Sequence, residues 1–186
     1  ADFIRRLETE LGLESSHALG LSHGIGDELV YQKRMDALNY TLSHDDGMHT
    51  ANYDRADVIL VGVSRTSKTP TCQYLANRGI KAANYPLVPT TPPPPGILNL
   101  KGPLVVGLTK DPERLVQARK ARLLSLNQDA RTDYVDLEQV RSELREARRL
   151  FTQRDWPVLD VTRRSIEEVA AAIINLLTEH RNQNGG

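Results

Sequence analysis

Short apolar runs alternate with helical patterns from residue 58 onward, and this alternation limits the fold more than any other feature of the sequence. The runs cover residues 58–61, 80–85, 104–108 and 158–161. The run 58–61 is continuously apolar, as in a strand buried on both faces of a parallel sheet. Helices are the usual crossovers between parallel strands. The expected fold is therefore α/β: a parallel sheet with flanking helices.

Local signals mark where the helices of this alternating region begin. The helix expected over 70–78 is closed by Gly79, a typical residue after a helix end. Start signals precede three further helices: Asp111 before Pro112, Asp136 with Gln139, and Ser165 with Glu168. Thr90 to Pro95 ends in four prolines and is expected to be a stiff spacer.

The first fifty residues have a different pattern, and we expect two parts, a helical segment over 1–50 and an α/β domain over 51–186. An apolar stripe over 3–11 predicts one short helix, and Asp27 can start a second. The second helix ends in the polar turn 43–47. The chain begins without a methionine and already in a helical pattern, so we interpret the segment as the remnant of a truncated N-terminal region.

Composition and charge exclude several classes of protein. Lysine and arginine total 24, as do aspartate and glutamate, so the formal net charge is zero. With this balance, the overall charge provides no attraction to nucleic acid or to an anionic membrane. Cys72 is the single cysteine, which excludes an internal disulfide framework and favours a reducing, cytoplasmic compartment. No apolar run approaches the length that spans a bilayer.

The segment 62–69 carries the strongest functional signal, because it fits the phosphate-loop pattern G-x-x-x-x-G-K-[ST] between a buried-type strand and a helix. The predicted phosphate-binding residues are Gly62, Val63, Ser64, Arg65, Thr66, Ser67, Lys68 and Thr69. Loop amides and the helix N-terminus would hold the phosphates by their dipoles. Lys68 would add a charge, Arg65 a bidentate contact, and Thr69 a hydroxyl that can ligate Mg²⁺.

One departure weakens the match: Ser67 replaces the second glycine of the pattern. Either the serine accepts a positive φ at a steric cost, or the loop has a different local shape. The alternative to a phosphate site is an ordinary polar turn with a solvated lysine. The placement after the first strand of the alternating region favours the phosphate site, and with it a phosphate-loop NTPase-like sheet.

His44, Asp45 and Asp46 form a second candidate group at the end of the helical segment. Phosphoryl transfer to a hydroxyl needs a group that orients or deprotonates it, and an aspartate or histidine can do so. The alternative is an ordinary helix stop, with an aspartate bonded to its own backbone.

Arg119 and Arg122 share one face of the helix after Pro112. They could neutralise charge on a transferred phosphoryl group, or could belong to a solvated basic face. The spacings of His23, His44 and His49 match no zinc pattern.

Longer motifs resemble a known family. The run ADVILVGVSRTSKTPTCQYLANRGIKAANYPLVP (56–89) resembles the signature of the pyruvate, phosphate dikinase regulatory protein family, whose relatives regulate phosphoenolpyruvate synthase. The resemblance continues through SHDDG (43–47), GLTKDPERL (107–115) and WPVLDVTRRSIEE (156–168). Full-length members carry a further N-terminal region, which agrees with the expected truncation.

The resemblance implies a bifunctional enzyme. Such a protein phosphorylates a threonine of its target with ADP as donor, and it removes that phosphate by phosphorolysis, releasing pyrophosphate. The resemblance also implies that Asp45 and His44, and after them Asp46, act in catalysis with Lys68. The target would be pyruvate, phosphate dikinase or phosphoenolpyruvate synthase, and a homodimer is a further expectation. The rival readings are an ATP-dependent small-molecule kinase and a non-catalytic nucleotide-sensing adaptor.

Overall fold

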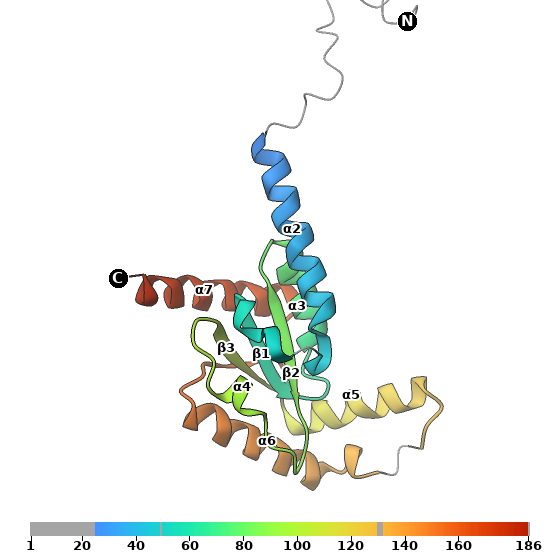
Figure 1. The fold of residues 1–186 in the computed structure, drawn as a ribbon. Coiled ribbons are helices and arrows are strands. Elements are labelled where there is room, and N and C mark those ends of the chain that lie inside the picture. The colour runs from blue at the N-terminus through green and yellow to red at the C-terminus, as the bar shows by residue number, and fades with distance from the viewer. Residues whose placement is uncertain (1–24, 49, 130–131, 186) are drawn as a thin grey trace, which may run out of the picture. The chain divides into compact units, whose positions relative to one another are not determined.

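The described residues form a sheet of four parallel strands in the order β2-β1-β3-β4. Figure 1 labels the first three of these strands. The computed structural model describes residues 25–48, 50–129 and 132–185. The strands are β1 (Val58–Val63), β2 (Ala82–Leu87), β3 (Leu104–Thr109) and β4 (Val158–Asp160). Every neighbouring pair is parallel. The α/β fold expected from the alternating pattern is confirmed.

Helix α2 precedes the sheet, and the other described helices follow its strands, including the short α4, which the sequence analysis did not predict. They are α2 (Ile25–Ser43), α3 (Lys68–Asn77), α4 (Pro95–Leu98), α5 (Pro112–Ser125), α6 (Leu137–Gln153) and α7 (Ile166–Asn184). Three 3-10 turns complete the described elements: η1 (Asp45–Gly47), η2 (Thr50–Arg55) and η3 (Asp133–Val135).

The chain divides into two compact units, Ala1–Gln32 and Lys33–Gly186, and the site described below lies in the second. The helix predicted over 3–11 falls outside the described residues. The predicted division at residue 50 stays a prediction. Among the described residues, no helix is both long and apolar enough to cross a membrane.

The helix-start signals of the sequence are confirmed with two differences. Helix α2 begins at Ile25, two residues before the predicted start at Asp27, so Asp27 lies in its first turn. Asp111 accepts a hydrogen bond from the Arg114 amide, and Ser165 and Glu168 form a reciprocal capping box. Helix α3 begins at Lys68, two residues before the predicted start at Pro70. Pro70 is then in the first turn, where helical amides have no intrahelical partner, so its missing N–H costs nothing.

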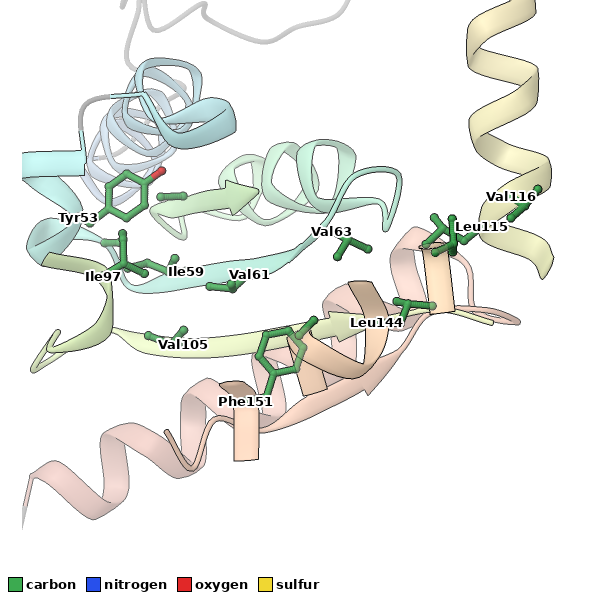
Figure 2. Close-up of a cluster of buried hydrophobic side chains, with 14 of the residues drawn as sticks. Tyr53, Ile59, Val61, Val63, Ile97, Val105, Leu115, Val116, Leu144 and Phe151 are labelled. Carbon is green, nitrogen blue, oxygen red and sulfur yellow. The ribbon is translucent and has the colours of Figure 1, made fainter. Parts of the chain in front are cut away.

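The sheet has a hydrophobic core on each face, which explains why the central strands β1 and β3 are continuously apolar and buried, whereas the edge strand β4 is largely exposed. Ile59, Val61 and Val105 face the core that α4, α5 and α6 cover (Figure 2). The alternate residues of β1 and β3 face a second core that α3 and α7 cover, built with Leu75 and Ile173.

Strand β2 is an edge strand, and the chain before β1 closes part of its outer edge. The Thr41 hydroxyl donates to the Ala82 carbonyl oxygen at 2.8 Å, and the Tyr53 hydroxyl donates to the Asn84 carbonyl oxygen at 2.6 Å. Pro86, two residues further on, has no N–H to offer a further strand. These bonds hold the end of α2 and the turn η2 beside the first half of β2.

Candidate functional site

The phosphate loop, residues 62–69, joins the end of β1 to the start of α3. Arg65 and Ser67 both have left-handed backbone conformations, with φ of 70° and 63°. Ser67 therefore adopts the conformation for which glycine is favoured, at a cost of about 1–2 kcal/mol. The Thr66 hydroxyl and the Lys68 ammonium both donate to the Val63 carbonyl oxygen, at 2.9 and 2.8 Å.

Gly62 has its own structural requirement. A Cβ at this position would lie 2.9 Å from both the Leu108 carbonyl oxygen and the Thr66 hydroxyl. Because these atoms belong to the next strand and to the loop itself, only glycine lets the loop approach β3 so closely. The first glycine of the motif thus serves packing at the base of the loop.

A cavity of about 460 Å³ opens at the phosphate loop, and we call it the phosphate cavity. The basic residues that line it are Arg65, Lys68, Lys110 and Arg122, and Asp46 is an acidic one. Among the described residues, no side chain caps the first turn of α3 at Ser67. Amides at a helix N-terminus together with several cations suit a polyphosphate, whose negative charge they offset.

Lys68 is the most buried of the cavity's cations, with 5% of its surface exposed. Burial lowers the pKa of its ammonium to about 8, with Arg119 acting in the same direction, while Asp46 and Asp45 oppose the shift. A poorly hydrated ammonium gains more from a bound anion than a solvated one does. The pKa of Lys110 is also lowered, by burial and then by Arg65 and Arg114.

Aspartates from η1 form the acidic side of the site. The Asp45 carboxylate accepts hydrogen bonds from the Thr69 hydroxyl at 2.8 Å and from the Asn84 side-chain amide. The Asn84 amide oxygen in turn accepts the Asp46 backbone N–H at 3.0 Å. Asp46 has a φ of 50° and lines the phosphate cavity. The structure thus brings Asp45, Asp46 and Thr69 together at the loop.

Asn84 is a site residue that the sequence analysis missed. It is 1% exposed in the middle of β2, and its side chain bonds to both aspartates of η1. The available signal was an asparagine inside an apolar run of strand length, because asparagine is depleted in strands.

His44 is packed against neighbouring rings, and it is not among the described residues that line the phosphate cavity. It is 5% exposed, and its Nδ1 donates to the Tyr40 carbonyl oxygen at 2.7 Å. Its ring stacks on Tyr40 with 3.9 Å between centroids, and Tyr53 lies on another side at 5.8 Å. His44 therefore anchors the chain just before the two aspartates.

The two predicted arginines of α5 have different environments. Arg122 lines the phosphate cavity. Arg119 is 1% exposed and forms a bidentate ion pair with Glu143, at 2.8 and 3.2 Å. The alternative of a solvated basic face is therefore excluded for Arg119.

Arg119 also connects the loop to η3. Its guanidinium lies 4.5 Å from the centroid of the Tyr134 ring and donates to the Tyr134 and Ser64 carbonyl oxygens, at 3.0 and 3.5 Å. The Tyr134 hydroxyl shares a 2.7 Å hydrogen bond with the Ser64 hydroxyl. Tyr134 is a second missed residue, and no local pattern marks it.

The donor atoms at Thr69 fit a magnesium ion. The Thr69 hydroxyl and the Asp45 carboxylate are hard oxygen ligands 2.8 Å apart, and Mg²⁺ typically takes one or two carboxylates plus phosphate oxygens and water. No cluster of three or more acidic, histidine or cysteine residues that could hold a metal occurs in the described part of the chain. His23 and His49 lie outside that part.

Cys72 is a packing residue, 1% exposed on α3. Burial raises the pKa of its thiol, so the reactive thiolate is disfavoured.

The loop at the end of a central parallel strand, together with the cationic cavity around it, defines a phosphate-loop α/β protein. The chain belongs to the Kinase/pyrophosphorylase family, whose model matches residues 1–174. The resemblance found in the sequence is thereby confirmed.

Similar curated proteins carry the name "Putative pyruvate, phosphate dikinase regulatory protein". One from Erythrobacter litoralis is 54% identical, over 93% of this chain and 62% of its own length. One from Caulobacter vibrioides is 53% identical over 96% of this chain and 56% of its own. A third, from Maricaulis maris, is 58% identical over 82% of this chain and 54% of its own. The chain thus spans less than two thirds of these relatives.

Proposed function

We propose that this chain is the phosphate-binding and catalytic part of a bifunctional regulatory enzyme. In one direction it phosphorylates a threonine of its protein target with ADP as donor. In the other it removes that phosphate with inorganic phosphate as acceptor and releases pyrophosphate. The observation that carries the proposal is that the buried Lys68, Thr69 with its bond to Asp45, and Asp46 come together at one cavity.

Both reactions suit one site. In the kinase direction a threonine hydroxyl attacks the β-phosphoryl group of ADP, the bond to the bridging oxygen breaks, and AMP leaves. In the phosphorylase direction a phosphate oxygen attacks the phosphothreonine phosphorus, and the threonine oxygen leaves with a proton. Each step is an in-line attack by oxygen, for which positioning and charge neutralisation are the main requirements.

We assign each of these tasks to residues according to their position in the site. Lys68, Arg65, Lys110 and Arg122 would hold the phosphates, with the loop amides. Thr69 and Asp45 would hold Mg²⁺, whose charge would offset that of the phosphate oxygens. Asp46, which lines the cavity, would orient the nucleophile.

Two predicted site residues would act indirectly, by holding other residues of the site in place. Arg119, bonded to Glu143 and to the Ser64 carbonyl oxygen, would brace the phosphate loop. His44 would hold the start of η1 by its bond to Tyr40.

The names of the relatives favour pyruvate, phosphate dikinase as the target, and phosphoenolpyruvate synthase stays a second candidate. A cytoplasmic location and a homodimer also stay predictions. The location is supported by the single, buried thiol of Cys72.

The test incubates the chain with each candidate enzyme and either ADP or ATP, and maps phosphothreonine by mass spectrometry. Phosphate is then added to the labelled target, and pyrophosphate is measured. We expect ADP-dependent labelling that Lys68→Ala abolishes. Lys101→Ala is the matched control, since Lys101 is exposed in the loop before β3, at the opposite end of the strands.

Three results would contradict the proposal. Labelling from ATP alone, or equal labelling by the Lys68 variant, would overturn the mechanism. Phosphorylation of a metabolite without a protein target would favour the small-molecule kinase. Inhibition of the target without a mass increase would favour the adaptor.

A further inference from the structure

A second cavity, of about 410 Å³, lies between α6 and the proline-rich segment that follows β2. We call it the apolar groove. Apolar residues from three elements form part of its lining: Val63, Leu87, Ala147 and Leu150. Val63 and Leu87 are the last residues of their strands, so the groove opens at the carboxyl edge of the sheet, as the phosphate loop does.

Two residues connect the groove with the phosphate site. Val63 lines the groove, while its carbonyl oxygen accepts the bonds from Lys68 and Thr66 of the phosphate loop. Glu143 also lines the groove, and it forms the ion pair with Arg119. A ligand in the groove would therefore lie next to the base of the phosphate loop.

The phosphate cavity is strongly basic, whereas the apolar groove is not. The phosphate cavity has four basic residues, whereas the described lining of the groove carries Glu143 and Glu146 and a single basic residue, Arg149. Arg149 forms an ion pair with Glu146 at 3.8 Å. Because Glu143 is paired with Arg119 as well, the described lining has no cluster of cations that could hold a polyphosphate, and it fits a neutral or basic occupant better.

The length of the groove fits an extended chain. Polar residues line it along one face of α6, from Gln139 through Ser142 and Glu146 to Gln153. At a rise of 1.5 Å per residue, this stripe is about 21 Å long, which corresponds to about six residues of extended polypeptide. A single nucleoside is much shorter than this stripe.

The wall opposite α6 determines how a peptide could be held. Pro89, Pro92 and Pro93 have no backbone N–H, so this wall cannot pair with a peptide as a full β-strand would. It is also stiff, which lowers the entropy lost on binding. The amides of Gln139 and Gln153 and the Ser142 hydroxyl could instead bond to a peptide backbone.

We propose that the apolar groove binds an extended segment of the protein substrate, with neutral or basic side chains, that flanks the acceptor threonine. This inference rests on the proposed function, since it assumes a polypeptide substrate. The groove would then select the protein target, while the phosphate cavity binds the donor.

The first test detects docking without relying on phosphotransfer. A photo-crosslinking amino acid is placed at position 142 or 153, and pyruvate, phosphate dikinase is added. Position 145, exposed on α6 and outside the groove lining, is the control. We expect cross-links to the dikinase from 142 and 153, and none from 145.

The second test uses a matched pair of charge reversals on α6. Glu146 and Glu138 both pair with an arginine three residues later, but only Glu146 lines the groove. We expect Glu146→Lys to raise KM for the dikinase about tenfold, with KM for ADP unchanged. Glu138→Lys should behave as the unmodified chain does.

The outcomes separate this inference from the proposed function. If the unmodified chain transfers no phosphate to either target, the proposed function fails. If transfer is normal but positions 142 and 153 give no cross-links, the groove proposal fails alone. It also fails alone if Glu146→Lys and Glu138→Lys have the same KM for the dikinase. If Glu146→Lys raises KM for ADP instead, the groove binds the nucleotide, and the proposal is wrong.

Discussion

Lys68 shows how a binding residue can reduce the stability of the fold that carries it. Its ammonium is buried, and its pKa of about 8 lies below the 10.5 of a solvated lysine. Between these pH values the folded protein binds fewer protons at this side chain than the unfolded chain does. The penalty for burying the charge is therefore complete below pH 8 and is relieved as the pH rises toward 10.5.

We predict that Lys68→Met stabilises the chain at pH 7 by roughly 1–3 kcal/mol, because methionine fills the site without a charge. The Val63 carbonyl oxygen keeps its bond from Thr66. The stability advantage of Lys68→Met over the unmodified chain should shrink as the pH rises from 8 to 10.5. Denaturant unfolding of both proteins across this range measures it, with Lys101→Met as control. An equal or lower stability of Lys68→Met at pH 7 would contradict the prediction.

Asn84 offers a second test at the residue scale. Asn84→Leu keeps the approximate size of the side chain but removes both bonds to η1, so Asp45 and Asp46 lose their common support. We predict that kcat for threonine phosphorylation falls at least tenfold, that KM for ADP changes less than threefold, and that the chain loses about 1–3 kcal/mol of stability.

Steady-state kinetics and denaturant unfolding check this prediction. The control is Asn77→Leu, an exposed position on α3. A rise in KM for ADP with kcat unchanged would mean that Asn84 acts on donor binding, contrary to the prediction.

At the scale of elements, the contact between β3 and α6 depends on a missing side chain. A Cβ at Gly107 would lie 2.5 Å from the ring of Phe151, which is fully buried. Helix α6 carries Glu143, which pairs with Arg119, and it forms one wall of the apolar groove. Its distance from the sheet therefore affects both the phosphate site and the groove.

We predict that Gly107→Ala destabilises the chain by about 1–3 kcal/mol through overpacking. Gly107→Ala combined with Phe151→Leu should lose less than the sum of the two single changes, because the two positions are in contact. Thermal and denaturant unfolding give these values. Gly96→Ala is the control, since a Cβ there meets nothing within 4 Å. Strict additivity would show that the ring is not the obstacle.

At the scale of the whole molecule, the attraction for phosphates is local. The formal net charge is zero, yet four basic residues meet at the phosphate cavity. We predict that pyrophosphate at a hundred times its Kd stabilises the chain by about 2.7 kcal/mol, which raises Tm by about 5–10 °C.

Differential scanning calorimetry checks this prediction. The shift should be small in Lys68→Met and unchanged in Lys101→Met, and added salt should reduce it. A shift of equal size in Lys68→Met would locate the anion outside the phosphate cavity.

The sequence alone was sufficient for the order of the four strands, the position of the loop after β1, and the helix starts at Asp111, Asp136 and Ser165. The caps at Asp111 and Ser165 and the loop after Val63 depend on residues a few positions apart, so local chemistry predicts them. Only the tertiary structure decided how the site is completed. Asn84 meets Asp45 across 39 positions, and Tyr134 meets Ser64 across 70. Local patterns do not encode such distant contacts, because packing of the sheet and helices creates them.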